Sequence, residues 1–519
     1  MNQLLRYCTW KNLFIALLVI HMLPIWIFPY FPSQDGPAHV YNSKVLKDYH
    51  DTDNHEIREA YRLNLRLFPN WTSHASMTAL MYVVPPIIAE KIFLTVTVAL
   101  LPLSLCYLLG AIDRRYVLFS LVGFIFSHNN MLHMGFYNFS LSVSLALFTL
   151  GYWWKHRGGI HVRQIVVLNV LLALTYVTHF GSYALLLTAM AIVALFDFVS
   201  GSVKTLWGLK PAGFTASGVW RGILSQLKPL GIYAGYMLMA HTLGLVYFLR
   251  TLQPFNESVP EIEWTTRYFW NMLILVSYTD WHVYVTRPIL GALIAAGIAS
   301  IVHRIWKRQW FSERDVFLLL AVVFTVLFFT SPSNQSGGSW VNQRIYIFIF
   351  PFLAAWFAMF HKSLRYIFGT ALVVLSLIHI GRYYYEYGAL QSEISEQVAA
   401  TKLIKPHSTF FLGDGSGLSE PLGDVKYVNP FHHSPCYYAL AAKDVVYLNN
   451  YEAGIHYFPV NWKSRPSQED RDNADYILIW HDPGDNKDKD MEKYMDRYNL
   501  IHTSRRVKLL QLNANQAPE

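Results

Sequence analysis

The stretch NLFIALLVIHMLPIWIFPYF, residues 12–31, is followed directly by PSQDGPAHVYNSKVLKDYHD, residues 32–51. The first stretch is apolar over about the 20 residues that a helix needs to cross a bilayer. No convincing small-residue cleavage site follows it, so we expect an uncleaved first membrane helix. The second stretch is polar, and Gly36-Pro37 predicts a turn from which a helix begins near Ala38. The chain therefore leaves the membrane here and enters a structured outer loop.

The composition is typical of a membrane protein. Of the 519 residues, 53% are hydrophobic and 15% are charged, whereas soluble domains carry about 25% charged residues. The net charge of +8 comes mostly from Lys and Arg in short loops between apolar runs. This distribution indicates membrane orientation and gives no reason to expect nucleic-acid binding. The scattered Cys8, Cys106 and Cys436 make neither a disulfide framework nor a paired metal motif.

Apolar runs of spanning length predict a mainly α, polytopic membrane protein with about eleven transmembrane helices. The expected ranges are 12–31, 91–111, 116–134, 138–154, 164–180, 182–199, 229–249, 287–303, 315–331, 345–361 and 366–381. Residues 70–88 are apolar but contain Pro85-Pro86, so we expect an interfacial or re-entrant helix there. Lys and Arg gather in alternate short loops, for example Arg114-Arg115, which predicts a cytoplasmic N-terminus. An odd number of spans then places the C-terminus outside.

A different composition begins after the last expected span. Short β-rich runs follow one another there, separated by polar stretches with Pro and Gly. They are STFFLG (408–413), DVVYLN (444–449), ADYILIW (474–480) and VKLLQL (507–512). With an expected helix over 388–403, they predict a small extracytoplasmic α/β domain at 385–519. The transmembrane domain is expected at 1–384, with its first outer loop at 32–90.

Asp35 lies a few residues beyond the first expected span, at the membrane surface. A carboxylate held there is partly desolvated, so its pKa rises towards neutrality and it can serve as a general base. The alternative is a structural role, because Asp before Gly-Pro suits the N-cap of the following helix. The two roles are compatible.

This arrangement resembles the GT-C superfamily of integral membrane glycosyltransferases, in particular the bacterial type that uses polyprenyl-phosphate sugars. DGPAH at 35–39 resembles the acidic motif that opens the first outer loop in those enzymes. FPNWTSHASMTALMYVVPPIIAEKIFL at 68–94 resembles the surface helix and second span that follow. The odd span count and the outer C-terminal domain match a common bacterial layout. The adjacent acidic pair of some GT-C members is missing from this loop.

The resemblance implies a specific reaction. A sugar would pass from a polyprenyl-phosphate donor to an acceptor hydroxyl on a lipid, a glycan or a protein at the outer membrane–water interface. Asp35 would be the general base, and direct displacement of the lipid phosphate would invert the anomeric centre. The implied location is a bacterial inner (cytoplasmic) membrane, with the C-terminal domain in the periplasm and a role in cell-envelope glycan biosynthesis.

A leaving phosphate needs positive charge near the interface, and Arg344 is the candidate. It lies in SGGSWVNQRIYIFIF (336–350), at the outer start of an expected span, with Asn342 two positions before it. A guanidinium can bind phosphate oxygens through two parallel hydrogen bonds. The resemblance also implies an Arg at this place. The alternative is an arginine whose side chain extends to the lipid headgroups.

Histidine and asparagine side chains gather on the same expected outer side. Polar residues at membrane depth are unfavourable unless they face a cavity or a partner, so these residues are candidates for binding the sugar or the lipid phosphate. They are His39 and His74 near the first loop, His128, Asn129, His133 and Asn138 between the third and fourth spans, and His179 after the fifth. The alternative for each is an ordinary interhelical hydrogen bond.

No metal cofactor is expected. Asp35 and His39 are four residues apart and can share a divalent ion, but two ligands do not make a site. The pair His432-His433 and the scattered acidic residues of the C-terminal domain are expected to be solvated at its surface.

Two other classes of function stay open on the sequence. A transporter or flippase usually has repeated halves and charges at the membrane midplane, whereas here the polar residues gather at one face. A polymerase or ligase of surface glycans would use large outer loops rich in Arg and His and would not need the C-terminal domain. The sequence favours the glycosyltransferase, whose partners would be the bilayer, the lipid-linked donor and the acceptor.

Overall fold

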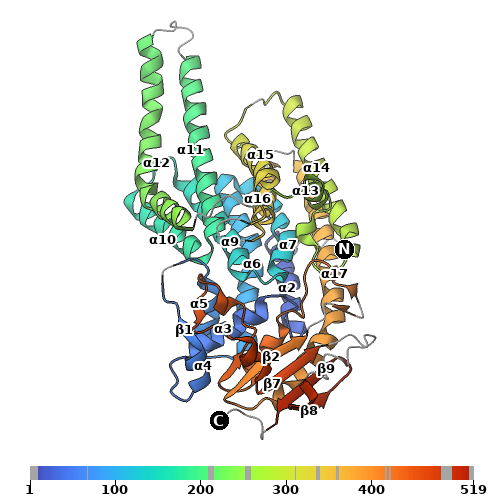
Figure 1. The fold of residues 1–519 in the computed structure, drawn as a ribbon. Coiled ribbons are helices and arrows are strands. Elements are labelled where there is room, and N and C mark those ends of the chain that lie inside the picture. Colours follow the sequence, from blue (N-terminus) through green and yellow to red (C-terminus); the bar gives the residue numbers. More distant parts are fainter. Residues whose placement is uncertain are drawn as a thin grey trace.

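The computed structural model describes residues 10–66, 68–208, 216–251, 259–309, 311–334, 339–357, 362–414, 418–419, 422–480 and 494–513. The chain forms two layers (Figure 1). One is a body of long helices, and the other combines the first outer loop with a C-terminal β-sheet at one end of that body. This arrangement confirms the predicted mainly α, polytopic fold with a small C-terminal α/β region.

The helices of the body are mostly apolar. They are α2 (Trp10–Ile27), α6 (Pro86–Ile112), α9 (Tyr137–His156), α10 (Val162–Thr178), α11 (Phe180–Gly208), α12 (Ala216–Thr251), α14 (Val283–Trp306), α15 (Asp315–Thr330), α16 (Val341–Phe357) and α17 (Lys362–Ala399). Within the described residues, 6 helices are long and apolar enough to cross a membrane, and α10, α15 and α16 are shorter apolar helices. Each helix of the body coincides with a predicted span, although several of them, for example α11, α12 and α17, extend beyond the expected ends.

The predicted span 116–134 is wrong as a continuous helix. The segment consists of a 3-10 helix, η1 (Arg114–Leu121), followed by α7 (Val122–Ser127) and α8 (Asn130–His133). His128 and Asn129 have extended backbone between the last two, and the Asn129 side chain accepts a hydrogen bond from the Leu132 N–H, which caps α8. A side chain that caps a new helix competes with continuation of the old one. Apolarity alone could not show this break.

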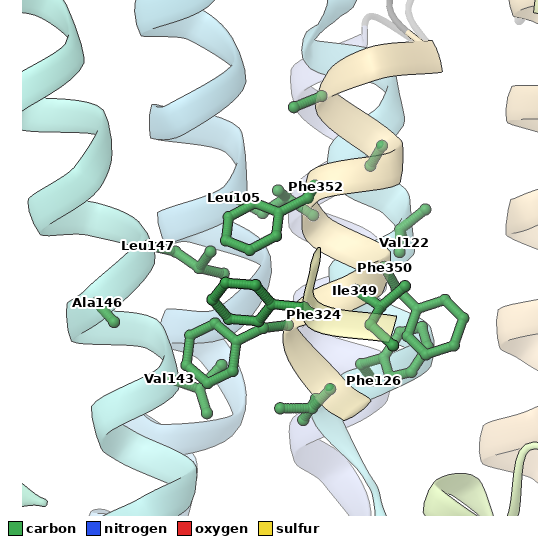
Figure 2. Close-up of a cluster of buried hydrophobic side chains, with 14 of the residues drawn as sticks. Leu105, Val122, Phe126, Val143, Ala146, Leu147, Phe324, Ile349, Phe350 and Phe352 are labelled. Carbon is green, nitrogen blue, oxygen red and sulfur yellow. The ribbon is translucent and has the colours of Figure 1, made fainter. Parts of the chain in front are cut away.

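Side chains from several helices interlock in the middle of the body (Figure 2). The residues labelled there are Leu105 of α6, Val122 and Phe126 of α7, Val143, Ala146 and Leu147 of α9, Phe324 of α15, and Ile349, Phe350 and Phe352 of α16. The rings of Phe126 and Phe350 stack with centroids 4.6 Å apart, and Phe324 meets Phe352 edge to face at 5.1 Å. Close packing of this kind holds helices together where lipid gives no hydrophobic driving force. It fixes the helices that carry the predicted polar residues.

The predicted basic loops meet at the end of the body that lies away from the sheet. Arg365, in the first turn of α17, donates a hydrogen bond to the Arg115 carbonyl at 2.6 Å. Arg314, just before α15, pairs with Asp113 at the same distance of 2.6 Å. Helices α11 and α12 also extend away from the sheet at this end (Figure 1). The basic segments that were predicted to share one side of the membrane therefore lie together.

The outer segments of the body carry short elements. The first outer loop contributes α3 (Gly36–Asp48), α4 (His55–Ala60), β1 (Tyr61–Leu63) and α5 (Thr72–Leu80), and the segment before α14 contributes α13 (Ile262–Trp270), η3 (Leu273–Leu275) and η4 (Asp280–His282). Helix α5 falls within the apolar segment 70–88 and ends before Pro85-Pro86, as expected for a short helix. These elements cover the outer ends of the membrane helices.

The C-terminal domain is built on a 5-stranded sheet in the order β5-β2-β7-β9-β8. The pairs among β5, β2 and β7 are parallel, and those among β7, β9 and β8 are antiparallel. The strands are β2 (Ser408–Asp414), β5 (Val445–Tyr447), β7 (Tyr476–Trp480), β8 (Tyr498–Thr503) and β9 (Val507–Leu512). All the predicted β-rich runs are thereby confirmed as strands, and β8 was not predicted.

Smaller elements connect the strands. They are η5 (Ala400–Leu403), β3 (Leu418–Ser419), β4 (Gly423–Asp424), η6 (Ser434–Tyr437), α18 (Tyr438–Ala441), η7 (Glu452–Gly454), β6 (Val460–Trp462) and α19 (Gln468–Asp472). Two of them, η6 and η7, lie against the first outer loop, because α3 packs on η6 and Glu452 of η7 contacts His39 and His74.

The first outer loop and the C-terminal domain form one layer. Strand β1 pairs antiparallel with β6, with Tyr61 opposite Trp462, and the two rings stack at 4.5 Å. The side-chain amides of Asn42 and Asn450, 408 positions apart, exchange hydrogen bonds of 3.0 and 2.8 Å. Helix α17 also continues without a break through residues 384–385, where a domain boundary was expected. Residues from both ends of the chain therefore meet at the end of the body that carries the sheet (Figure 1).

Candidate functional site

Backbone geometry fixes the start of α3, where Asp35 lies. The turn after α8 passes directly beside it, and the Asp35 N–H donates to the Met134 carbonyl at 3.2 Å. Gly135 in this turn has a φ of 86°, and a Cβ there would lie only 2.6 Å from the Gly36 nitrogen. Only glycine combines such a close approach with a positive φ at no steric cost. The turn therefore sets the position of Asp35.

The Asp35 carboxylate is not used to cap α3. Asp35 occupies the N-cap position, but its side chain makes no cap hydrogen bond. The residue is 9% exposed, and Gln34 Nε2 donates to its Oδ1 at 3.3 Å. Burial raises the pKa of Asp35 from 3.8 to about 6, although the charge of His39 and the hydrogen bond from Gln34 lower it. A general base works best with a pKa near the working pH, so this carboxylate suits proton abstraction near neutrality.

His433 of the C-terminal domain faces Asp35. Its Nε2 lies 3.7 Å from Asp35 Oδ1, and its ring stacks on Tyr451 with centroids 4.5 Å apart. The expectation of a surface position is wrong for His433, which is 8% exposed because Asp35 and Tyr451 enclose it, whereas His432 is exposed. Burial and the neighbouring His432 lower the pKa of His433 to about 3. A neutral imidazole therefore lies beside the carboxylate.

A second buried cluster lies one helical turn from Asp35. His39 of α3 and His74 of α5 both contact Glu452 of η7: His39 Nδ1 is 2.7 Å from Oε1, and His74 Nε2 is 2.8 Å from Oε2. Burial alone would raise the pKa of Glu452, but the two histidines lower it to about 2. Burial alone would also lower the pKa of His39, but the Glu452 carboxylate outweighs this effect and raises it. The negative charge of Glu452 in η7 therefore connects this turn with both α3 and α5.

Arg344 packs against side chains of the helical body. It lies in the first turn of α16, where its Nη1 is 2.9 Å from His179 Nε2. The guanidinium carbon lies 4.6 Å from the ring centre of Phe136 and 5.4 Å from that of Phe139. Its Nε has no hydrogen-bond partner among the described residues, so a donor is left for a ligand. The Gly-rich stretch 335–338 before it lies outside the described residues.

Tyr457 connects Arg344 with the two acidic groups. Burial raises the pKa of its phenol, and the charges of Arg344, Glu452 and Asp35 all act on it. Interactions between side-chain charges in a protein are short-ranged. Arg344, Glu452 and Asp35 therefore all lie within electrostatic reach of Tyr457.

The side chains of His128 and His133 bond to groups within the body. The Tyr387 hydroxyl is 3.0 Å from His128 Nδ1 and also contacts His133 Nε2. The other nitrogens are bonded too, His128 Nε2 to the His21 carbonyl at 2.8 Å and His133 Nδ1 to Ser277 Oγ at 2.7 Å. Every ring nitrogen of the pair has a partner, which matches the alternative of interhelical hydrogen bonding.

The predicted asparagines hold the backbone. Asn129 caps α8, and Asn138 Oδ1 accepts a hydrogen bond from the Ser73 N–H at 2.7 Å, which ties α9 to α5. Asn342 Oδ1 accepts from the Gln343 N–H at 3.0 Å, and its Nδ2 has no partner among the described residues. Of these three asparagines, Asn342 is the one with an unpaired buried donor. It lies on α16, the helix that carries Arg344.

The sequence did not predict the side chains that the C-terminal domain contributes to the site. Glu452, Tyr451 and Tyr457 lie in NNYEAGIHYF (449–458), which contains no recognisable motif. The available signal was an acidic residue between aromatic residues in a Gly-containing turn of a β-rich domain. That signal is weak, because turns of this composition are common on protein surfaces.

Comparison with known proteins gives similarity in structure but not in sequence. No protein-family model matches the chain, and no curated protein sequence matches it. The fold is similar to the cryo-EM structure of the arabinofuranosyltransferase AftD from Mycobacteria, with 12% sequence identity and a TM-score of 0.48. The similarity covers 98% of this chain and 40% of that one, so the chain spans well under half the length of that protein.

Proposed function

We propose that this chain is an integral membrane glycosyltransferase. It moves a sugar from a polyprenyl-phosphate donor to an acceptor hydroxyl on a lipid, a glycan or a protein. The observation that carries the proposal is the state of Asp35, whose buried carboxylate does not cap its helix and has a pKa raised to about 6 by burial. A carboxylate left unused by the fold and tuned towards neutral pH is suited to general-base catalysis.

In the proposed reaction, the acceptor oxygen attacks the anomeric carbon from the side opposite to the phosphate. The new glycosidic C–O bond forms as the bond between the anomeric carbon and the phosphate oxygen breaks, and the electron pair leaves with polyprenyl phosphate. Asp35 takes the proton of the acceptor hydroxyl and later releases it to solvent. A single displacement inverts the anomeric centre.

Arg344 is the proposed partner of the departing phosphate. Its guanidinium is already positioned by His179 and the ring of Phe136, so little reorganisation is needed when negative charge develops. Its unpaired Nε, and the unpaired Nδ2 of Asn342, are donors suited to phosphate oxygens. Tyr457 lies within electrostatic reach of both Arg344 and Asp35, which supports a substrate region shared by the proposed base and the proposed phosphate partner.

We propose that the outer layer faces away from the cytoplasm. The basic segments around Arg115, Arg314 and Arg365 gather at the opposite end of the body, and positively charged loops stay on the cytoplasmic side. In a bacterial inner membrane, Asp35 and the C-terminal domain would then face the periplasm. A lipid-linked donor in the outer leaflet of that membrane would present its sugar at this level.

The test uses the full chain in nanodiscs, with labelled polyprenyl-phosphate sugars and candidate lipid and glycan acceptors. Asp35→Asn is expected to lower the transfer rate by about 10²–10⁴-fold, the usual contribution of a general base. Asp53→Asn is the matched control, because Asp53 belongs to the same loop and pairs with Lys443 at the surface. Transfer by Asp35→Asn at the wild-type rate would remove Asp35 as the base. A wild-type protein that moves the donor across vesicles without cleaving it would instead be a flippase.

A further inference from the structure

We propose that His39, His74 and Glu452 bind a zinc ion between the first outer loop and the C-terminal domain. Each side chain offers one ligand atom, and these atoms lie within 4.8 Å of one another. Two imidazoles and a carboxylate are a frequent protein donor set for zinc. The proposal departs from the expectation of no metal, and it stands independently of the transferase activity.

In a neutral His39, the hydrogen bonds of the ring leave the lone pair of Nδ1 facing a lone pair of Glu452 Oε1. The Gly135 carbonyl, 2.9 Å from His39 Nε2, can only accept, so Nε2 carries the proton. In the neutral ring, Nδ1 is then unprotonated, and it lies 2.7 Å from Glu452 Oε1. The two atoms are not aligned for a hydrogen bond, and neither has another hydrogen-bond partner among the described residues. A buried contact of this kind requires a cation shared by the two atoms, which is either a proton on Nδ1 or a metal ion.

His74 approaches the same carboxylate from the other side. Its Nε2 lies 2.8 Å from Glu452 Oε2, and its Nδ1 lies 3.4 Å from Ser73 Oγ. Both imidazoles therefore have a polar partner on the nitrogen that points away from the carboxylate, namely the Gly135 carbonyl and the Ser73 hydroxyl. Metal-binding histidines almost always have such a partner, which fixes the tautomer and the ring orientation.

The surroundings exclude water from the cluster. The side chains of His74 and Glu452 are fully buried and that of His39 is 6% exposed. The ring of Phe458 lies against both imidazoles, with centroid distances of 6.0 Å to His39 and 5.7 Å to His74. An apolar shell of this kind strengthens the attraction between a cation and its ligands.

The distances need only a small adjustment to admit zinc. Zinc binds nitrogen and oxygen at about 2.0–2.1 Å in a tetrahedral arrangement, which separates two ligand atoms by about 3.3 Å. The two contacts of Glu452, 2.7 and 2.8 Å, are a few tenths of an ångström shorter than this. A slight withdrawal of one carboxylate therefore opens the central position.

The ion would have a structural consequence for Asp35. The His39 N–H donates to the Asp35 carbonyl at 3.2 Å in the first turn of α3. A metal bond at His39 fixes this turn relative to η7 of the C-terminal domain. His39 is thus proposed as a positioning residue, which holds the helix that carries Asp35.

The first measurement is the metal content of the full chain in detergent, purified without chelators. Elemental analysis is expected to find about one zinc per chain, as in a three-ligand protein site. Stripping with a chelator should lower the Tm, and added zinc should restore it, because an ion that binds only the folded state stabilises that state. Wild-type protein with no bound zinc and no zinc-dependent Tm would overturn the proposal and leave a protonated His–Glu–His cluster.

His74→Gln separates metal binding from hydrogen bonding, because its amide can still donate to Glu452. This variant is expected to fold with the Tm of the stripped wild type, to hold less than about a tenth of the zinc, and to show no Tm response to added zinc. His50→Ala is the matched control, since it removes an exposed histidine of the same loop and should keep the zinc. Full zinc content in His74→Gln would mean that the ion binds elsewhere. These readouts need no substrate, so they are decided separately from the transfer assay.

Discussion

In the helical body, the ring nitrogens of His128 and His133 are all paired, with the Tyr387 hydroxyl bridging the two rings. In the outer layer, His39 Nδ1 and Glu452 Oε1 lie 2.7 Å apart without an aligned hydrogen bond. Both clusters bury polar side chains, but of these two only the contact between His39 and Glu452 leaves bonding capacity unused. Buried polar groups are normally satisfied, so unsatisfied ones point to function.

The two ends of the molecule also differ in how their carboxylates are paired. At the basic end of the body, Asp113 is paired with Arg314 at 2.6 Å. At the other end, the close partners of the Asp35 carboxylate are a neutral histidine, an amide and the Tyr451 hydroxyl, and burial raises its pKa to about 6. A carboxylate in an ion pair stabilises the fold, whereas a buried one with a raised pKa is available for proton transfer. The substitutions below test this division.

The largest effect in this comparison is expected for Arg344→Ala. It removes a charged donor from the region that would bind the donor phosphate. A hydrogen bond to a charged group contributes about 1.5–3 kcal/mol, so kcat/KM for the lipid-linked donor should fall by about 10–150-fold. The measurement is initial-rate kinetics with varied donor. Arg287→Ala removes an exposed arginine of α14 and should leave these kinetics unchanged. Equal loss in both variants would indicate a general effect of surface charge.

A smaller effect is expected on stability when Asp35 is replaced by Asn. Because the folded pKa of about 6 exceeds the ordinary 3.8, the protonated carboxyl contributes stability below pH 3.8, and this contribution is lost as the pH rises through 6. Asn stays neutral, so Asp35→Asn should be more stable than wild type by about 2–3 kcal/mol at pH 8. The difference should vanish near pH 4. Thermal unfolding of both proteins at the two pH values measures it, and a variant less stable at pH 8 would show that Asp35 is a structural residue.

The smallest effect is expected for Tyr387→Phe in the body. It leaves the facing nitrogens of His128 and His133 without the hydroxyl that bridges them. Loss of a buried hydrogen-bond partner should lower the free energy of unfolding by about 1–3 kcal/mol, without changing the kcat of the folded protein. Tyr385→Phe is the control, because that side chain is 59% exposed. A selective loss of kcat in Tyr387→Phe would show that His128 and His133 take part in the reaction.

Much of the fold followed from the sequence because lipid imposes a simple rule. A helix that crosses a bilayer needs a long apolar run, and the body's long helices lie where such runs were found. The β-rich runs at 408–413 and 474–480 became β2 and β7 for a similar reason, since continuous apolar segments suit buried parallel strands. The break after Ser127 escaped this rule, because it depends on one capping side chain, that of Asn129.

Only part of the candidate site could be predicted from the sequence. Asp35 and Arg344 could be proposed because each stands at the boundary between a polar and an apolar stretch. Glu452 could not, because its partner His74 lies 378 positions away and only the folded chain brings them together. His433 was misplaced for the same reason, since its burial comes from Asp35 in the first outer loop and from Tyr451.

The most direct test of the central claim is the pH dependence of kcat/KM for sugar transfer by the wild-type protein. This parameter reports the pKa of the free enzyme's essential base. If Asp35 is that base, kcat/KM should be level above pH 7 and fall about tenfold per pH unit below about 6. A profile that stays flat between pH 5 and 8 would contradict the account.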